Sequence, residues 1–218
     1  VLAHLSGLGE RAAVACLRAV FQHMGCDPQV LDPIQLLRCT GDPLQATPDE
    51  PAIRLLFEGF RSGSHALGLM AGFFGGDARG KVMSLGRGGS DWSAALAAAA
   101  LHADELEIWT DVDGIYSADP RTVPEAAPIA ELSFAEAAEL AHFGAKVLHP
   151  KTIAPARRHG IAVRVCDTFA PGRPGTWIRA AVAPPEAAVR GITVLGGIAL
   201  VNVSGAGMPG VPGVAAHI

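Results

Sequence analysis

The sequence predicts an α/β fold in which a sheet lies between layers of helices. Segments with apolar residues at helical spacing alternate along the chain with short apolar runs bounded by glycines, and such runs are typical of buried strands. Half of the 218 residues are hydrophobic and 17% are charged, a composition typical of a globular chain with a sizeable core. Helices that alternate with short buried strands favour a sheet covered by helices.

The expected elements follow one another in a regular order. We expect helices at Glu10–Met24, Ala52–Phe60, Asp91–His102, from the capping box Ser133-Phe-Ala-Glu136 to about His142, and at Pro150–His159. We expect strands at Val30–Asp32, Ala66–Phe74, Lys81–Leu85, Leu106–Thr110 and Ile161–Asp167. Gly25 suits the end of the first helix. The segment Pro33–Pro51 is expected to be irregular because three prolines, at positions 43, 48 and 51, punctuate it.

The C-terminal part of the chain predicts a boundary between two domains. Ala180–Val189 (AAVAPPEAAV) has the composition of a linker, Ile192–Val203 resembles two strands, and Val211–Ile218 resembles the first turns of a further helix. We therefore expect one domain over residues 1–180, a linker over 181–190 and the start of a second domain over 191–218.

Composition excludes several classes of function. The net charge is -4 and the longest basic run is Arg157-Arg158, which argues against a nucleic-acid partner. No apolar stretch approaches the length of a membrane span. The four cysteines stand alone, without a C-x-x-C pair, so we expect free thiols in a reducing cytoplasm and no cysteine metal site.

The stretch Leu85-Gly-Arg-Gly-Gly-Ser-Asp91 leads from an expected buried strand into an expected helix. Glycines let a backbone approach a ligand closely, and a helix N-terminus offers N–H groups and a partial positive charge. Arg87 adds a fork of donors that suits a carboxylate or a phosphate. The turn therefore predicts a site for a small anion, although a structural turn with a solvated arginine has the same pattern.

Two further stretches place polar residues beside apolar ones. Trp109-Thr-Asp-Val-Asp-Gly-Ile-Tyr-Ser-Ala-Asp-Pro-Arg121 sets polar side chains at the end of an expected strand, where open α/β sheets bind ligands. Tyr116 could contact a purine face and Arg121 could reach phosphates. In Phe143-Gly-Ala-Lys146-Val-Leu-His149-Pro150, the lysine is either a phosphate ligand or a side chain that reaches from apolar surroundings to water, and His149 is expected to have a structural role.

In this order and spacing, the three stretches resemble the amino-acid kinase superfamily and, within it, the aspartokinases. The stretch at Thr110–Arg121 is similar to the nucleotide-binding segment of the whole superfamily, whereas the other two resemble aspartokinase more narrowly. The resemblance extends to Leu8-Gly-Glu-Arg11, Leu69-Met-Ala-Gly-Phe73, the Pro-Gly-Thr176 region and, in the tail, Val201–Met208 with Gly210–Val214, which resemble the opening of an ACT regulatory domain.

The resemblance implies a fold, a reaction and ligands. The fold would be the three-layer α/β/α sandwich of the amino-acid kinase type, followed by the start of a ferredoxin-like ACT domain. The reaction would be the transfer of a phosphate from ATP, with Mg²⁺, to the side-chain carboxylate of L-aspartate, the first step toward lysine, threonine and methionine. Lysine or threonine would act as feedback ligand at the ACT region, and pairing of ACT domains would give a homo-oligomer.

The resemblance also assigns roles to residues. Glu10 would hold the amino group of aspartate and Arg87 its carboxylate, while Gly88, Gly89 and Ser90 would complete the aspartate site and Asp91 would orient groups at the active centre. The ATP site would be lined by Thr110, Asp111, Tyr116, Arg121 and Lys146. Arg87 and Asp91 would be the catalytic residues. The resemblance assigns no residue as a metal ligand.

One departure from the family pattern matters for activity. The Lys-Phe-Gly-Gly-Thr-Ser-type motif with the catalytic lysine has no counterpart before Gly9, so we expect the 218 residues alone to be inactive and to belong to a longer protein, with a slight preference for a fusion to homoserine dehydrogenase. Two alternatives stay open. One is a glutamate 5-kinase-like enzyme, and the other is a non-catalytic subunit that senses amino acids or ATP.

Overall fold

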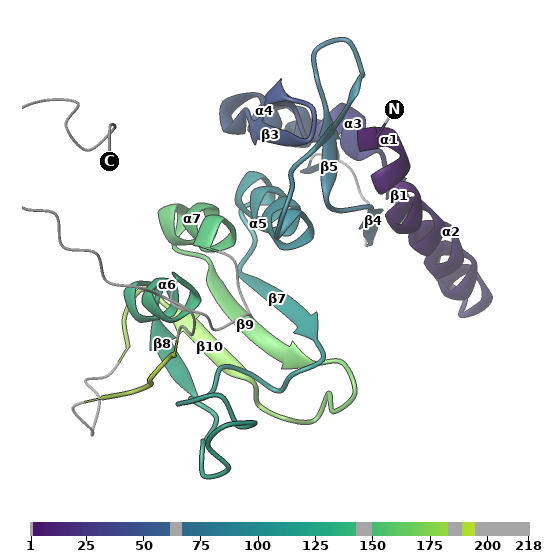
Figure 1. The fold of residues 1–218 in the computed structure, drawn as a ribbon. Helices are drawn as coiled ribbons and strands as arrows, with labels where there is room; N and C mark the ends of the chain where they lie inside the picture. The colour runs from purple at the N-terminus through teal and green to yellow at the C-terminus, as the bar shows by residue number, and fades with distance from the viewer. Residues whose placement is uncertain (1, 62–66, 143–149, 183–188, 195–218) are drawn as a thin grey trace, which may run out of the picture.

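The computed structural model describes residues 2–61, 67–142, 150–182 and 189–194, which form a mixed helix and sheet fold (Figure 1). The helices are α1 (Leu2–Ser6), α2 (Leu8–His23), α3 (Pro33–Leu36), α4 (Glu50–Arg61), α5 (Gly89–Leu101), α6 (Phe134–His142) and α7 (Pro150–His159). The strands are β1 (Gln29–Leu31), β2 (Cys39–Asp42), β3 (Gln45–Pro48), β4 (Gly68–Met70), β5 (Phe74–Gly76), β6 (Val82–Ser84), β7 (Glu105–Thr110), β8 (Glu131–Ser133), β9 (Ala162–Asp167) and β10 (Thr176–Arg179). No helix within these described ranges has the length and apolar character needed to cross a membrane.

A four-stranded sheet with the order β7-β9-β10-β8 organises the second half of the described chain. β7 runs parallel to β9, β9 is antiparallel to β10, and β10 is parallel to β8. The helices α5, α6 and α7 lie over one face of this sheet (Figure 1). Because β7 and β9 are parallel and in register from Glu105↔Ala162 to Thr110↔Asp167, their carboxyl ends meet at one edge of the sheet.

The core of the molecule lies between this sheet and its helices. Val163, Val165 and Ile178 are at most 1% exposed on the face that meets the helices. The alanines of α5, among them Ala95 and Ala99, are buried in the same cluster, and their small side chains allow close packing against the strands and α7. Burial of each large aliphatic side chain stabilises the fold by about 1.5–3 kcal/mol.

The opposite face of the sheet is covered by its own polar and aromatic side chains. Arg164 forms an ion pair with Glu107 across the β7–β9 pair at 3.2 Å, and its guanidinium carbon lies 5.2 Å from the centre of the Trp177 ring. Arg179 lies 4.3 Å from the same ring and pairs with Glu131 at 3.0 Å. Cation–π contacts and ion pairs therefore stack across four strands here.

The first half of the described chain contains three two-stranded sheets. β1 pairs in parallel with β4, while β2–β3 and β5–β6 are antiparallel pairs. The helix α4 packs on α5, and Leu37, Ile53, Phe57 and Leu96 form a buried cluster between them and α3. This cluster joins the two halves of the molecule because α5 belongs to both.

Most predicted elements are confirmed. The five predicted helices correspond to α2, α4, α5, α6 and α7 to within two residues, and the strands predicted near Val30, Lys81, Leu106 and Ile161 are present to within one residue. The capping box of α6 is also confirmed, since the backbone N–H of Glu136 donates to Ser133 Oγ at 3.2 Å and that of Ser133 donates to Glu136 Oε2 at 2.7 Å. Gly25 ends α2 with a positive φ of 81°.

Two predictions of local structure are wrong. The segment Pro33–Pro51 is not irregular, because it contains α3 and the β2–β3 hairpin. Asp42 Oδ1 accepts the N–H of Leu44 at 2.7 Å, so an Asx turn builds this hairpin around its proline. Ala66–Phe74 is not a single strand, because Phe73 has a positive φ of 76° that separates β4 from β5.

Some elements were missed, and others lie beyond the described residues. β8 and β10 were not predicted, although both belong to the main sheet. Of the two strands predicted over Ile192–Val203, only residues 192–194 are described, and they are not part of a strand. The rest of that segment and the helix predicted at Val211–Ile218 lie outside the described residues, so the domain boundaries at 180 and 190 stay a prediction.

Candidate active site

The glycine-rich turn between β6 and α5 has the geometry expected of an anion site. Gly86 and Gly88 have positive φ angles of 75° and 70°, and Gly88 is the residue that caps α5. The side chains of Arg87 and Ser90 are exposed, and Asp91 is half-buried in the first turn of the helix. The turn therefore presents an arginine and the positive end of a helix dipole to solvent.

Gly72 and Phe73, directly before β5, pack against this turn. The backbone C=O of Phe73 accepts the N–H of Leu85 at 2.9 Å, and the N–H of Phe73 donates to Ser93 Oγ at 3.2 Å. Ser93 Oγ in turn donates to the C=O of Ser90 at 2.7 Å. A Cβ at Gly72 would lie 2.8 Å from Ser93 Oγ and 3.1 Å from Ser90 Cα. The predicted Leu69–Phe73 segment thus lies directly against the predicted anion turn.

Glu10 lies in the first turn of α2, in a neighbouring part of the same half of the molecule. The next residue, Arg11, stacks on Phe74 with its guanidinium carbon 5.0 Å from the ring centre. A Cβ at Gly7 would lie 2.7 Å from the Phe74 ring, so the start of α2 packs closely on the residue that follows Phe73. The start of α2 and the glycine-rich turn therefore both contact the Phe73–Phe74 segment, but through residues other than Glu10 and Arg87.

The predicted nucleotide residues begin at the carboxyl edge of the parallel strands. Thr110 ends β7, its Oγ1 donates to Asp111 Oδ1 at 3.1 Å, and its C=O accepts the N–H of Thr168 at 2.8 Å. Asp167 ends β9 directly opposite Thr110. Since ligands of open α/β sheets bind at such carboxyl ends, the position of Thr110 and the exposed Asp111 fits the role predicted for them.

The loop after β7 is held by a network around Asp113. The hydroxyl of Tyr116 donates to Asp113 Oδ1 at 2.6 Å, and the guanidinium of Arg173 pairs with the other carboxylate oxygen. The hydrogen bond from Tyr116 and, to a smaller extent, the one from Arg173 hold the pKa of Asp113 below its usual range. The same hydrogen bond raises the pKa of the Tyr116 hydroxyl. The hydrogen bond to Asp113 therefore orients the Tyr116 side chain. Its aromatic ring is the part that remains available to contact the purine ring of a nucleotide.

Thr176 of β10 fixes the loop from inside the protein. Its Oγ1 accepts the N–H of Ile115 at 2.8 Å and donates to the C=O of Ile129 at 2.6 Å. A Cβ at Gly114, which has a φ of 138°, would lie 2.5 Å from Thr176 Oγ1. Only glycine suits this position, because both its backbone angle and the close hydroxyl exclude a side chain.

Arg121, a further predicted nucleotide residue, makes no described contact with this cluster. Arg121 binds Asp119 in a bidentate pair at 2.8 and 3.0 Å, and its side chain is 80% exposed. A phosphate contact by Arg121 would require that pair to open. Lys146 lies outside the described residues, as do His149 and the rest of the stretch from 143 to 149.

Sequence reasoning missed several residues that shape the site. Asp113 was given no role, but it orients Tyr116, and Thr176 was matched to the family without a role. Ser93 and Asp167 were not singled out. A signal for Ser93 was present in its spacing, because a serine three residues after Ser90 can bond back to the first turn of the helix.

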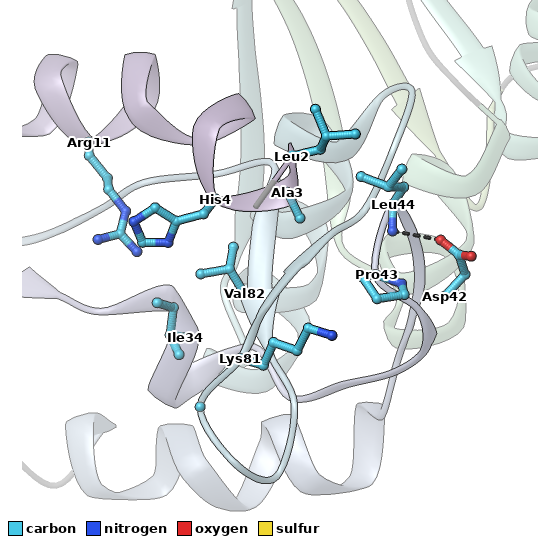
Figure 2. Close-up of a pocket in the computed structure, with 11 residues that line it drawn as sticks. Leu2, Ala3, His4, Arg11, Ile34, Asp42, Pro43, Leu44, Lys81 and Val82 are labelled. Atoms are coloured by element: carbon cyan, nitrogen blue, oxygen red, sulfur yellow. Dashed lines mark hydrogen bonds between the residues drawn. The ribbon is translucent and has the colours of Figure 1, made fainter.

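A separate hollow of about 730 Å³ lies between α1 and the turn from β5 to β6 (Figure 2). Its polar walls include His4 and Arg11 on one side, and the side chain of Lys81 extends toward Pro43 and Asp42 on the other. Its lining includes none of the predicted site residues that the structure describes. The predicted site is therefore not this hollow but the open surface around the Arg87 turn and the end of β7.

Comparison with known proteins agrees with this geometry. Residues 2–167 match the model of the amino acid kinase family, and the chain belongs to that family. It is 40% identical over 210 residues to a bifunctional aspartokinase/homoserine dehydrogenase of Haemophilus influenzae, which covers 96% of this chain and 26% of that protein. It is 52% identical over 115 residues to lysine-sensitive aspartokinase 3 of Escherichia coli, which covers 53% of this chain and 26% of that one.

A solved structure shows the same fold. Aspartokinase III of E. coli in complex with aspartate and ADP superimposes with a TM-score of 0.77 at 39% identity, over 84% of this chain and 42% of that one. The predicted α/β class and the amino-acid kinase fold are therefore confirmed. The chain spans only about a quarter of the length of the two relatives named above.

Proposed function

We propose that this chain is the C-terminal part of the catalytic domain of an aspartate kinase, which phosphorylates the side-chain carboxylate of L-aspartate to 4-phospho-L-aspartate. The observation that supports this most directly is the turn between β6 and α5, where Arg87 and the helix N-terminus face solvent beside Asp91. The relatives at 40% and 52% identity are aspartokinases, and the superimposed structure holds aspartate and ADP.

In this proposal the residues divide between two ligands. Arg87 binds the α-carboxylate of aspartate, Glu10 binds its amino group, and Ser90 with the amides of Gly88 and Gly89 completes the pocket. Thr110, Asp111 and Tyr116 bind ATP at the end of β7, and Arg121, once released from Asp119, binds its phosphates together with Lys146. The first set lies around α5 and α2 and the second follows β7, so the two ligands would approach from different segments of the fold.

The chemistry asks mainly for alignment and charge neutralisation. The aspartate carboxylate is ionised at neutral pH, so its oxygen can attack the terminal phosphorus of ATP without a general base, and the bond from that phosphorus to ADP breaks. Arg87 and Lys146 would reduce the repulsion between the two anions, and Asp91 would orient groups around the transferred phosphate.

The donor set suits a Mg²⁺ ion that is bound together with ATP. Among the described residues, no three His, Cys, Asp or Glu side chains lie close enough to hold a metal. Mg²⁺ usually keeps several waters and takes one or two carboxylates together with phosphate oxygens. Asp91 and the exposed Asp111 are the carboxylates that would serve, and bound Mg²⁺ would neutralise charge on the phosphates.

Further parts of the proposal concern the whole protein. We propose that it is cytoplasmic, forms a homo-oligomer and is inhibited by lysine or threonine at an ACT region that begins near residue 191. The name of one relative, a lysine-sensitive aspartokinase, supports feedback by an amino acid. We also propose that the 218 residues alone are inactive, since they lack a counterpart of the family's lysine-bearing motif.

Steady-state kinetics of the full-length polypeptide tests the assignment of the two ligand sites. Release of ADP should depend on aspartate, and glutamate should not replace it. Arg87→Ala should raise the KM for aspartate, and Asp111→Asn should raise the KM for ATP. Equal effects of both variants on both substrates would contradict the division into two sites.

A further inference from the structure

The segment 189–194 makes contacts with two separate parts of the kinase domain. Arg190 Nη1 donates to the C=O of Glu131 in β8 at 2.6 Å, and Arg190 Nε lies 2.9 Å from Glu136 Oε1 in α6. Two residues later, the N–H of Ile192 donates to the C=O of Ser117 at 2.7 Å. Only 18% of the Arg190 side chain is exposed, so this is an inserted side chain and not a loose surface contact.

Ser133 holds the Glu136 carboxylate that pairs with Arg190. Glu136 Oε2 accepts both the N–H and the hydroxyl of Ser133 at 2.7 Å, which leaves Oε1 facing Arg190. The pKa of Glu136 is lowered first by the Ser133 hydroxyl, then by the Ser133 N–H, and also by the nearby charge of Arg190. The capping box of α6 therefore serves two purposes: it starts the helix and it presents a fixed charge to the segment that follows residue 188.

Ser117 connects this anchor to the loop with the proposed nucleotide ligands. It directly follows Tyr116. Its N–H donates to the C=O of Ala127 at 2.9 Å, and its Oγ accepts the N–H of Ala127 at 3.1 Å. The remaining backbone group, the C=O, accepts the N–H of Ile192. Gly191 fits closely beside it, since a Cβ there would lie 3.4 Å from the Ser117 oxygen and 3.3 Å from Leu140 Cδ2.

We propose that Arg190 is a positioning residue for the nucleotide site, which it affects by holding Ile192 on Ser117 and thereby fixing the loop that contains Tyr116. This inference rests on the proposed function, because it assigns that loop to ATP. Movement of residues 190–192 away from α6 would free the Ser117 carbonyl and loosen the loop. The Arg87 turn lies between β6 and α5 and shares none of these contacts, so the aspartate site should be unaffected.

The position of Arg190 in the chain would let the proposed ACT region influence ATP binding through the Arg190–Glu136 pair. Arg190 directly precedes residue 191, where the proposed ACT region begins, so a movement of that region would be transmitted along the chain to Arg190. A shift that withdraws Arg190 from Glu136 would weaken ATP binding without altering the residues that touch ATP. Coupling between two sites of this kind typically changes affinity by about 5- to 150-fold.

The test uses three variants of the full-length polypeptide. In Arg190→Ala, the KM for ATP and the Kd for MgADP should rise about 5- to 30-fold. The KM for aspartate and kcat should stay within about twofold. Arg190→Lys should recover part of the loss, because an ammonium group can pair with Glu136 but cannot also reach the carbonyl of Glu131. Arg179→Ala is the matched control, since it removes an ion pair to the same strand, β8, without touching Ser117.

Hydrogen exchange provides a second readout that does not depend on activity. The backbone N–H groups of Ser117 and Ile129 are bonded within the loop region, and they should exchange faster in Arg190→Ala but not in Arg179→Ala. Two results would overturn this inference alone, provided that the wild type binds nucleotide normally. One is an equal effect of Arg190→Ala and Arg179→Ala, and the other is an equal change in the KM values for ATP and aspartate in Arg190→Ala. A wild-type protein that binds no nucleotide would overturn the proposed function and the inference together.

Discussion

The substitution Thr176→Val tests how the loop after β7 is held. Thr176 is 0% exposed, and its hydroxyl both accepts the N–H of Ile115 at 2.8 Å and donates to the C=O of Ile129 at 2.6 Å. Valine has nearly the same shape but leaves these two buried groups without that partner. Each buried polar group that loses its hydrogen bond costs about 1–3 kcal/mol.

We therefore expect Thr176→Val to lower the free energy of unfolding by about 2–4 kcal/mol. For a domain of this size the midpoint of thermal unfolding should fall by roughly 5–15 °C. Circular dichroism during heating measures that midpoint, and urea unfolding measures the free energy. The amide of Ile115 should also exchange with solvent faster than in the wild type.

Thr40→Val is the matched control. Thr40 is exposed, and its hydroxyl makes one long bond to the C=O of Thr47 at 3.4 Å, so the same chemical change should alter the free energy of unfolding by less than about 0.5 kcal/mol. If Thr176→Val proved as stable as Thr40→Val, the buried hydroxyl would not hold the loop and the reasoning would be refuted.

Three further predictions concern other parts of the molecule. Gly72→Ala should reduce both stability and turnover, because its Cβ would lie 2.8 Å from Ser93 Oγ, and thermal unfolding with kinetics of the full-length protein measures both. Because the pKa of Asp113 is lowered in the folded state, its contribution to stability is complete above the unfolded value of about 3.9 and is lost as the pH falls through the folded pKa. Urea unfolding from pH 6 to pH 2 should therefore show a smaller loss in Asp113→Asn. Burial raises the pKa of Cys39 to about 11, so at pH 8 the native protein should be alkylated by iodoacetamide at the exposed Cys16 and not at Cys39.

Each of these three predictions has a control variant or a result that would contradict it. Gly9→Ala is matched to Gly72→Ala, since no atom lies within 4 Å of a Cβ at Gly9, and equal losses in the two would contradict the packing explanation. An Asp113→Asn protein with the same acid sensitivity as the wild type would exclude that carboxylate as a cause. Equal labelling of Cys39 and Cys16 in the folded protein would contradict the burial of Cys39.

The helices were predictable because their signals are local. A capping box, a glycine after the last turn and apolar residues at helical spacing each lie within a few positions of the helix that they define. The strands β8 and β10 are short and mix polar with apolar residues, so neither gives the apolar run bounded by glycines that predicted β6. Their pairing depends on partners far along the chain, such as Leu132 with Ile178.

In the candidate site, too, local features were predictable from the sequence and long-range contacts were not. The Arg87 turn and the polar residues after β7 were visible because glycines, an arginine and carboxylates are contiguous in the sequence. The contacts that hold them were not, since Thr176 bonds to a residue 61 positions away and Arg190 to one 59 positions away. The positive φ of Phe73 was also beyond prediction, because a bulky residue rarely adopts that conformation.

The most direct test of the central proposal is the trapping of the acyl phosphate with hydroxylamine. The full-length polypeptide, given MgATP and aspartate, should form aspartyl hydroxamate, and it should form none with glutamate. Arg87→Ala should abolish the product at low aspartate. Absence of any hydroxamate with either amino acid, in a protein that still binds ATP, would contradict the aspartate kinase proposal and favour a subunit that senses ligands without catalysis.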